Sequence, residues 1–430
     1  MLQLQLDLDQ PQLPQGTDSV RHLLARITPP APDPTREVPP LDLAIVIDAS
    51  GSMNGPPLAA ATEATLRLAR ELPSSTRLTV VSFAHDIIVH ADGLPLNQQG
   101  RREIQSNLLS LETRGATNLH AGWQTGCTLL AAETEHVTGR RKHVVVLSDG
   151  HANQGLQEPA ALASESRLQL DQGISTSCVG IGDGYSPEQL AALADHGGGS
   201  CHDAENAGEI VEVLLGEALS LSEVVAENVK LALHVPEGIH ARELSGIPST
   251  FDGHDLVAAA GAVRAGVERT IVVRLEIPAG MDLQGLAFMA HLTWHGPGSS
   301  PQTRGPPTPA TCQRVTGDIH PPTPEDARSV LLAWQANLVR RITALNRDGN
   351  FTGIDALWRS EFAPFMAYAK LTPETEQFAD DMHKIRRRAA RPMRERDRKV
   401  SVDIAGKYAC QESAYYSKSK GGVADQFEDY

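Results

Sequence analysis

The stretch LDLAIVID, residues 41–48, is an almost unbroken apolar run that ends abruptly at Asp48. A second such run, KHVVVLSDG at 142–150, leads to Asp149. Strands with this composition are buried on both faces, as in parallel sheets that helices cover on each side. The two runs therefore restrict this part of the chain to an α/β architecture around a mainly parallel sheet.

Strand and helix patterns alternate throughout residues 40–220, which we predict to form one α/β domain. Such alternation is typical of a mainly parallel, Rossmann-like sheet with helices on both faces. The helical patterns cover residues 56–72, 101–112, 119–137, 158–170, 186–196 and 207–221.

The segments on either side of this domain have a different periodicity. Residues 1–36 and 222–297 contain short runs in which apolar and polar residues alternate, as in NVKLALHV at 228–235. A period of two residues predicts strands with one buried face. We therefore expect an antiparallel β-sandwich whose first strands come from residues 1–36, with the α/β domain nested within it.

Three further segments follow the predicted sandwich. Residues 298–323 are rich in Pro, Gly, Ser and Thr, which predicts a linker that could hold one strand. Apolar residues recur with helical spacing at 324–400, which predicts a helical region. Residues 401–430 contain little apolar mass, and we expect a mostly flexible tail.

Oxygen-bearing side chains gather where the buried strands are predicted to end. Ser50 and Ser52 follow Asp48 at alternate positions, and ligands of open α/β sheets bind beyond the carboxyl ends of the strands. The loop GATNL should reach the same edge. The resulting candidate metal ligands are Asp48, Ser50, Ser52, Thr117 and Asp149.

Two carboxylates and three hydroxyls suit a hard cation. Mg²⁺ prefers oxygen ligands, few carboxylates and retained waters, and Mn²⁺ or Ca²⁺ could take its place. We expect Gly51 to let the turn bend so that both serines face inward. The alternative is a polar strand end that caps a helix with Ser and Asp.

These residues resemble the von Willebrand factor type A (VWA) family and its metal-ion-dependent adhesion site, MIDAS. The shared motif is Asp-x-Ser-x-Ser, then a distant Thr, then a distant Asp after an apolar strand. The resemblance covers about residues 40–220. A looser similarity, in the order of elements alone, extends to bacterial proteins in which a VWA domain is nested in β-rich segments and followed by helices.

The resemblance implies binding rather than catalysis, with an Asp or Glu of a protein partner completing the metal coordination. We therefore expect an adaptor or assembly subunit and no enzyme. Two alternatives remain open at this point. The chain could be a regulatory subunit of an AAA+ ATPase machine, or a hydrolase that uses the metal or Cys201.

Composition limits the partners and the compartment. The net charge of −15 argues against nucleic acid and anionic membrane as partners, and no apolar run is long enough to span a bilayer. The start of the chain, MLQLQLDLDQ, lacks the pattern of a secretory signal. Five dispersed cysteines without a CxxC pair indicate a reducing compartment, and we expect the cytoplasm.

Three other features have a structural and a functional interpretation. His151 could tune the site, although a surface-loop histidine is the simpler interpretation. The stretch DHGGGSCHD at 195–203 suggests zinc or a Cys–His nucleophile, but its spacing favours a strand and a loop. The basic stretch 384–399 could bind an acidic surface, although a solvated helix end is simpler.

Overall fold

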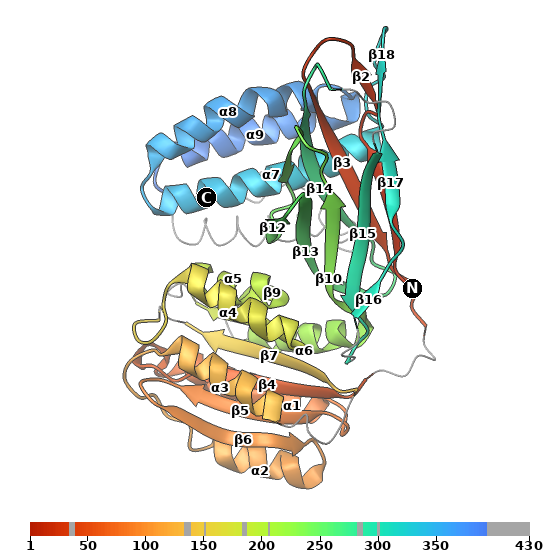
Figure 1. The fold of residues 1–430 in the computed structure, drawn as a ribbon. Coiled ribbons are helices and arrows are strands. Elements are labelled where there is room, and N and C mark those ends of the chain that lie inside the picture. The colour runs from red at the N-terminus through yellow and green to blue at the C-terminus, as the bar shows by residue number, and fades with distance from the viewer. Residues whose placement is uncertain are drawn as a thin grey trace.

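The computed structural model describes residues 1–33, 39–132, 139–149, 152–182, 187–204, 207–281, 287–298 and 302–393, with the backbone alone at 207, 219 and 222. Figure 1 shows an α/β domain below and a β-sandwich with the C-terminal helices above. The expectations for His151, for residues 394–399 of the basic stretch and for the tail 401–430 lie outside the described residues.

A six-stranded sheet forms the centre of the α/β domain. Its order is β6-β5-β4-β7-β8-β9, and every neighbouring pair is parallel except β6, which lies antiparallel to β5 at one edge. The strands are β4 (Leu41–Asp48), β5 (Arg77–Phe83), β6 (Ile87–Pro95), β7 (Arg141–Ser148), β8 (Ile174–Ile181) and β9 (Gly198–Ala204). The predicted mainly parallel sheet is confirmed.

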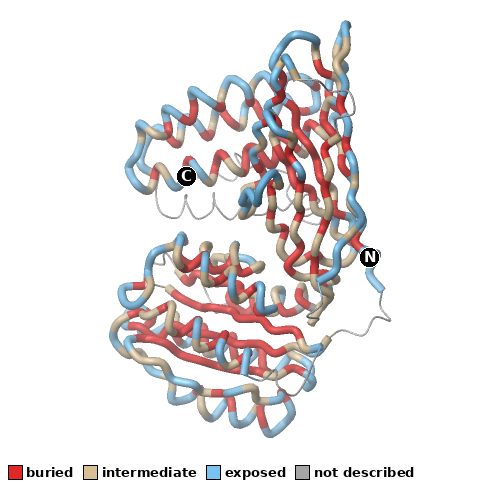
Figure 2. Tube along the Cα trace, in the orientation of Figure 1, coloured by how far each residue is buried: buried red, intermediate tan, exposed pale blue. Residues whose placement is uncertain are grey.

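Helices cover both faces of this sheet because its strands are apolar on both sides (Figure 2). Leu43, Ile45 and Ile47 of β4 pack in one cluster with α1, α2 and α6, and Ala44 and Val46 pack on the opposite face with α3, α4 and α5. The helices are α1 (Pro56–Glu71), α2 (Gln98–Leu108), α3 (Leu119–Ala132), α4 (Pro159–Asp171), α5 (Pro187–His196) and α6 (Ala207–Glu223), and a short 3-10 turn covers Gly51–Met53.

The β-sandwich contains strands from both sides of the α/β domain, so the predicted nested architecture is confirmed. One sheet has the order β1-β3-β14-β11, and the other β12-β13-β10-β15-β16 with β17 also on β15. The first comprises β1 (Gln3–Leu8), β3 (Ser19–Thr28), β14 (Arg269–Ile277) and β11 (His240–Glu243). The second comprises β12 (Ser249–Asp252), β13 (Asp255–Arg264), β10 (Val224–His234), β15 (Ala287–His295), β16 (Gln302–Arg304) and β17 (Thr308–Thr311).

The prediction of a linker with one possible strand at 298–323 needs correction. Its described part contributes β16 and β17, which pair with β15, and β18 (Gln313–Val315), which pairs with β2 (Gln12–Pro14). Proline is compatible with strands at a sheet edge, where one side of the backbone needs no partner. A composition typical of linkers therefore also suits short edge strands.

The predicted boundary between residues 220 and 222 falls inside a helix. α6 runs to Glu223, and β10 begins at the next residue, so no loop separates the α/β domain from the sandwich. Ion pairs cross the junction: Arg141 Nε lies 2.5 Å from Glu227 Oε1, and Lys230 Nζ lies 2.8 Å from Asp171 Oδ1. The two parts are joined by continuous secondary structure and by charge pairs.

Three helices pack against the outer face of the first sandwich sheet. They are α7 (Pro324–Arg347), α8 (Phe351–Ala369) and α9 (Gln377–Ala389), and a 3-10 turn covers Pro373–Thr375. Leu24 of β3 and Val272 of β14 belong to the helical core, whereas Leu23 and Val273 face the sandwich core. The first sheet is therefore buried on both faces. None of the described helices is long and apolar enough to cross a membrane.

Buried charged groups form hydrogen bonds and ion pairs between the helices and the sandwich. Glu361 of α8 accepts a hydrogen bond from Trp334 Nε1 at 2.9 Å, and it forms an ion pair with Arg242 of β11 at 2.8 Å. Tyr368 of α8 donates a hydrogen bond to Asp9 at 2.9 Å. Since each carboxylate has partners from other elements, its burial fixes how α8 sits on the sheet.

We predict that removing residues 1–36 destroys the sandwich but leaves the α/β domain folded. The deletion removes β1 and β3, which leaves the apolar side chains of β14 without partners, while the α/β domain keeps its own two cores. Thermal unfolding should then lose one cooperative transition. Leu23→Ala should lower the free energy of unfolding of the sandwich by about 2–5 kcal/mol, because Leu23 is fully buried. Val20→Ala, at an exposed position of the same strand, is the control. An unchanged sandwich transition in the truncated chain would contradict the prediction.

A second prediction concerns pH. Burial raises the pKa of Glu243 to about 7 from 4.5, although backbone N–H groups of Ser245 and Gly246 bind its carboxylate. Between these two values the folded state keeps a proton that the unfolded state releases, so stability falls as pH rises from about 4.5 to about 7. Across this pH range the loss of stability due to Glu243 should be on the order of 1–3 kcal/mol, and Glu243→Gln should remove it.

Denaturant unfolding at several pH values measures this slope. Glu237→Gln, at an exposed position after β10, is the matched control and should leave the slope unchanged. The interpretation fails if Glu243→Gln and the wild-type chain lose the same stability across this pH range.

Candidate functional site

The ends of β4 and β7 form the edge of the sheet at which the candidate residues gather. The two strands are neighbours and parallel, so their carboxyl ends lie together. β4 ends at Asp48, which is fully buried, and β7 ends at Ser148, immediately before the half-buried Asp149. Two carboxylates that are far apart in the sequence are therefore brought to one edge.

Both oxygens of Asp48 are fixed by hydrogen bonds. Oδ1 accepts the backbone N–H of Ser50 at 2.8 Å, and Oδ2 accepts the hydroxyl of Ser148 at 2.6 Å. The first bond bends the chain directly after β4, and the second joins β4 to β7. The carboxylate therefore has a single orientation.

The two serines continue this arrangement toward the surface. Ser50 Oγ lies 3.0 Å from Ser52 Oγ, and Ser52 donates its hydroxyl to Asp149 Oδ1 at 2.8 Å. Ser50 is buried, whereas Ser52 is exposed. Four of the five predicted residues thus form one connected set, and its oxygens extend from the protein interior to solvent.

Thr117 reaches the same edge through its loop. Gly51 donates its N–H to Gly115 O at 2.9 Å, which holds the loop against the serine turn. Asn153 Oδ1 accepts the N–H of Thr117 at 2.9 Å, and Thr117 is 4% exposed. The structure thus places the fifth residue at the edge, held by backbone contacts.

The explanation expected for Gly51 is wrong, because Gly51 does not adopt a positive φ. The glycine that this site requires is Gly115, whose φ is +86° and which occupies the loop opposite. A Cβ at Gly115 would also lie 3.1 Å from His85 Nδ1. The tight turn therefore depends on the loop before Thr117.

The electrostatics of the edge favour a bound cation. Burial raises the pKa of Asp48, and the charge of Asp149 adds to this effect, while hydrogen bonds from Ser148 and Ser50 oppose it. Burial likewise raises the pKa of Asp149. Among the described residues neither carboxylate has a lysine or arginine partner. Such a pair is stabilised by a positive ion.

The donor set fits a small hard ion. Asp48 and Asp149 supply charge, and Ser50, Ser52 and Thr117 supply neutral oxygens, which matches the preference of Mg²⁺. The described part of the chain holds no group of three or more His, Cys, Asp or Glu residues suited to a metal. The edge differs from such sites because three of its five side chains carry hydroxyls.

Sequence reasoning missed two residues that support this site. Ser148 orients Asp48, and Asn153 fixes Thr117. Ser148 precedes Asp149 directly, yet it reads as the last residue of a strand, so its direction toward β4 could not be inferred. Asn153 lies in the polar run HANQG, where no pattern distinguishes it from a loop residue.

The helix-capping alternative does not describe this turn. Ser50 stands at the N-cap position of the 3-10 turn Gly51–Met53, but its side chain makes no capping hydrogen bond. Gly55 precedes α1 and has no side chain to cap with. The hydroxyl of Ser50 faces Ser52 instead, so the polar residues form a site rather than a cap.

The stretch 195–203 does not form a Cys–His pair. Cys201 packs with the cluster on the α4 and α5 side of the sheet. His202, on the opposite side of β9, lies with its Nε2 3.3 Å from Glu217 Oε2 of α6. The preferred interpretation, a strand and a loop, agrees with this arrangement.

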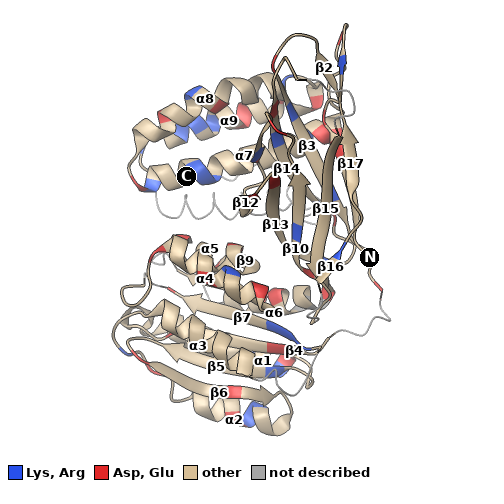
Figure 3. Ribbon diagram, in the orientation of Figure 1, with Lys and Arg blue, Asp and Glu red and all other residues tan. Residues whose placement is uncertain are grey.

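Residues 384–389 of the basic stretch form the last turns of α9. Arg386 stacks over the ring of Phe362, 4.9 Å from its centroid, and Lys384 lies 4.0 Å from Asp381. Figure 3 marks Lys and Arg positions in blue along the C-terminal helices. These contacts lie within the helical region, and Arg386 and Arg387 are exposed, which agrees with the simpler interpretation, a solvated helix end.

The comparisons with known proteins agree with this geometry. Residues 42–213 match the family model of the von Willebrand factor type A domain. The protein YfbK of Escherichia coli is 27% identical over 199 residues, which are 46% of this chain and 34% of YfbK. The chain spans about half or less of the length of the curated relatives it matches.

Two solved structures share the fold over nearly the whole chain. A von Willebrand factor type A protein from Catenulispora acidiphila has a TM-score of 0.65 at 15% identity, with 95% of this chain and 96% of that chain covered. The ArnB paralog VWA2 from Sulfolobus acidocaldarius has a TM-score of 0.59 at 16% identity, with 95% and 98% covered. The sandwich and the C-terminal helices are thus part of a shared architecture.

We predict that Ser148→Ala weakens Mg²⁺ binding without removing a metal ligand. The substitution removes the hydroxyl that binds Asp48 Oδ2 and lets the carboxylate rotate. Residues that orient metal ligands typically affect affinity by about 10- to 100-fold. Isothermal titration calorimetry with Mg²⁺ measures the change.

Ser166→Ala is the matched control. Ser166 is also fully buried and donates its hydroxyl to Leu193 O at 2.6 Å, far along the chain from the candidate site. Equal Mg²⁺ affinity in Ser148→Ala and Ser166→Ala, with both variants folded, would show that Ser148 does not support the site.

Proposed function

We propose that the von Willebrand factor type A domain of this chain, residues 42–213, captures an acidic side chain of a protein partner at a divalent-cation site. The residues that would hold the cation are Asp48, Ser50, Ser52, Thr117 and Asp149. The observation that carries the proposal is the connected set of oxygens at the ends of β4 and β7, with two carboxylates that have raised pKa values.

The residues of the site have different roles, which follow from their charge and burial. Asp48 and Asp149 together balance the charge of one divalent ion, and the hydroxyls of Ser50 and Ser52 add ligands without adding charge. When bound, Mg²⁺ supplies an open coordination position that accepts a carboxylate oxygen. Mn²⁺ or Ca²⁺ could serve in its place. The neutral hydroxyls leave that position more attractive to an anion than further carboxylates would.

The burial of these residues supports access for a partner from one direction. Asp48 and Ser50 are buried, Asp149 is half-buried and Ser52 is exposed. His85, whose side chain is 56% exposed, borders the same edge through its contact with the Gly115 loop. A partner side chain would therefore enter over Ser52, on the exposed side of the site, with Asp48 deepest.

Binding is favoured over catalysis by the partners of the site residues. Asp48, Ser50, Ser52 and Asp149 hydrogen-bond to one another, to Ser148 and to the backbone. In the described part of the chain none of them pairs with a histidine or lysine that could act as a general base. The role that fits is that of an adaptor or assembly subunit.

The first test is the response of stability to metal. Mg²⁺ in 100-fold excess over its Kd should stabilise the folded chain by about 2.7 kcal/mol through mass action. Asp48→Ala should abolish the effect, since it removes a charged ligand. Asp42→Ala, at the opposite end of β4, is the control. A melting temperature that responds equally to Mg²⁺ in wild type and Asp48→Ala would refute the metal site.

The second part of the test concerns the partner. A partner identified by affinity capture in Mg²⁺ should bind with far lower affinity in EDTA, as measured by calorimetry. Thr117→Ala should weaken this binding more than it lowers stability, and Thr125→Ala in α3 should leave it unchanged. Full affinity after every acidic residue in the partner's contact segment is replaced would rule out carboxylate capture.

A further inference from the structure

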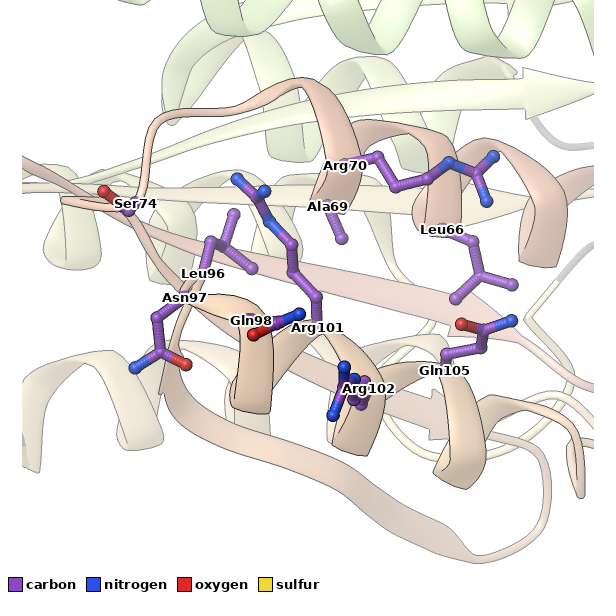
Figure 4. A pocket seen from close by; sticks show the side chains of 10 residues that line it. All are labelled: Leu66, Ala69, Arg70, Ser74, Leu96, Asn97, Gln98, Arg101, Arg102 and Gln105. Carbon is purple, nitrogen blue, oxygen red and sulfur yellow. The ribbon is translucent and has the colours of Figure 1, made fainter.

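A groove lies between α1 and α2, remote from the candidate metal site. α1 begins at Pro56 beside the metal-site turn and runs to Glu71 at the other end of the sheet, where Arg77 of β5 pairs with Pro95 just before α2. The groove has a volume of about 490 Å³ (Figure 4). It is therefore near the amino ends of the parallel strands, whereas the metal site is at their carboxyl ends.

The lining of the groove is basic in an acidic chain. Three of its ten lining residues are arginines and none is acidic, although the chain carries a net charge of −15. Arg70 comes from α1, and Arg101 and Arg102 come from α2, so two elements supply positive charge along the groove (Figure 4). α2 also has no acidic residue in its first turn to offset the positive end of its dipole.

These guanidinium groups are available to an anion. Arg101 is held in place because its NH2 group donates to Leu72 O at 2.8 Å, while its Nε is buried and has no hydrogen-bond partner. Among the described residues, no carboxylate lies within ion-pair distance of Arg70, Arg101 or Arg102. By contrast, Arg67 of α1 pairs with Glu71 at 2.8 Å.

The remaining lining distinguishes between classes of anion. Leu66, Ala69 and Leu96 form an apolar floor, and Asn97, Gln98 and Gln105 supply amides that can bind a peptide backbone. No aromatic ring lines the groove, so a nucleotide base would have no stacking partner there. Arginines around an apolar floor fit a peptide in which acidic side chains flank an apolar one.

We propose that the α1–α2 groove binds an acidic peptide segment of a protein partner, independently of the metal site. Arg101 is preorganised to take one carboxylate, Arg70 and Arg102 take others, and the apolar residue between them covers Leu66 and Leu96. Arginine favours this role because its planar fork can bind a carboxylate with two hydrogen bonds.

The probe for this proposal is a fluorescein-labelled peptide of sequence DDFDD, with NNFNN as the neutral control. Fluorescence anisotropy with the full chain should show binding of DDFDD that weakens as salt is raised, and much weaker binding of NNFNN. The double variant Arg70→Glu/Arg102→Glu should weaken binding of DDFDD by about tenfold or more. Arg70 and Arg102 are both exposed, so folding should persist.

The control variant Arg67→Glu/Arg359→Glu makes the same change of net charge at two arginines outside the groove and should retain the affinity. Binding should also persist in EDTA and in Asp48→Ala, which separates the groove from the metal site. If both double variants weakened binding of DDFDD equally, the effect would come from net charge alone, and the proposal would be overturned. Tighter binding of ATP than of DDFDD, lost in Arg70→Glu/Arg102→Glu, would overturn the choice of a peptide.

Discussion

Burial on both faces of the central strands determines where this protein can place polar chemistry. β4 and β7 are enclosed by helices on each side, so their interior positions accept only apolar side chains, apart from residues that find buried partners. Polar side chains that bind a ligand are therefore found at the strand ends. The candidate metal site lies at the carboxyl ends of β4 and β7 for this reason.

The buried carboxylates show how differently the chain compensates for lost hydration. Glu217 is satisfied by Ser177 and His202, and its pKa falls to about 2. Glu361 is surrounded by arginines, and its pKa also falls. Among the described residues Asp48 accepts hydrogen bonds from a hydroxyl and from backbone, and burial raises its pKa. A carboxylate that its own protein leaves uncompensated is the one suited to an external cation.

The sequence predicted the α/β domain, its nested position and the five candidate residues, because each depends on local pattern. Asp48 and Asp149 end apolar runs, and that position alone indicates the edge of a sheet. Ser148 and Asn153 could not be identified, because their roles depend on which loop or strand lies opposite. At most one strand was predicted at 298–323, where the structure has β16, β17 and β18, because their pairing depends on distant strands rather than on their own composition.

The position of β3 has a consequence for the order in which this chain can fold. β3 pairs with β14 and packs against α7, both of which are synthesised more than two hundred residues later. At roughly 5–20 residues per second, the nascent chain holds an apolar hairpin of β1 and β3 for tens of seconds before its partners emerge. The α/β domain, whose sheet and two cores come from one continuous segment, can fold in that interval. Synthesis of this protein thus depends on keeping its first strands from associating with other chains until its last helices arrive.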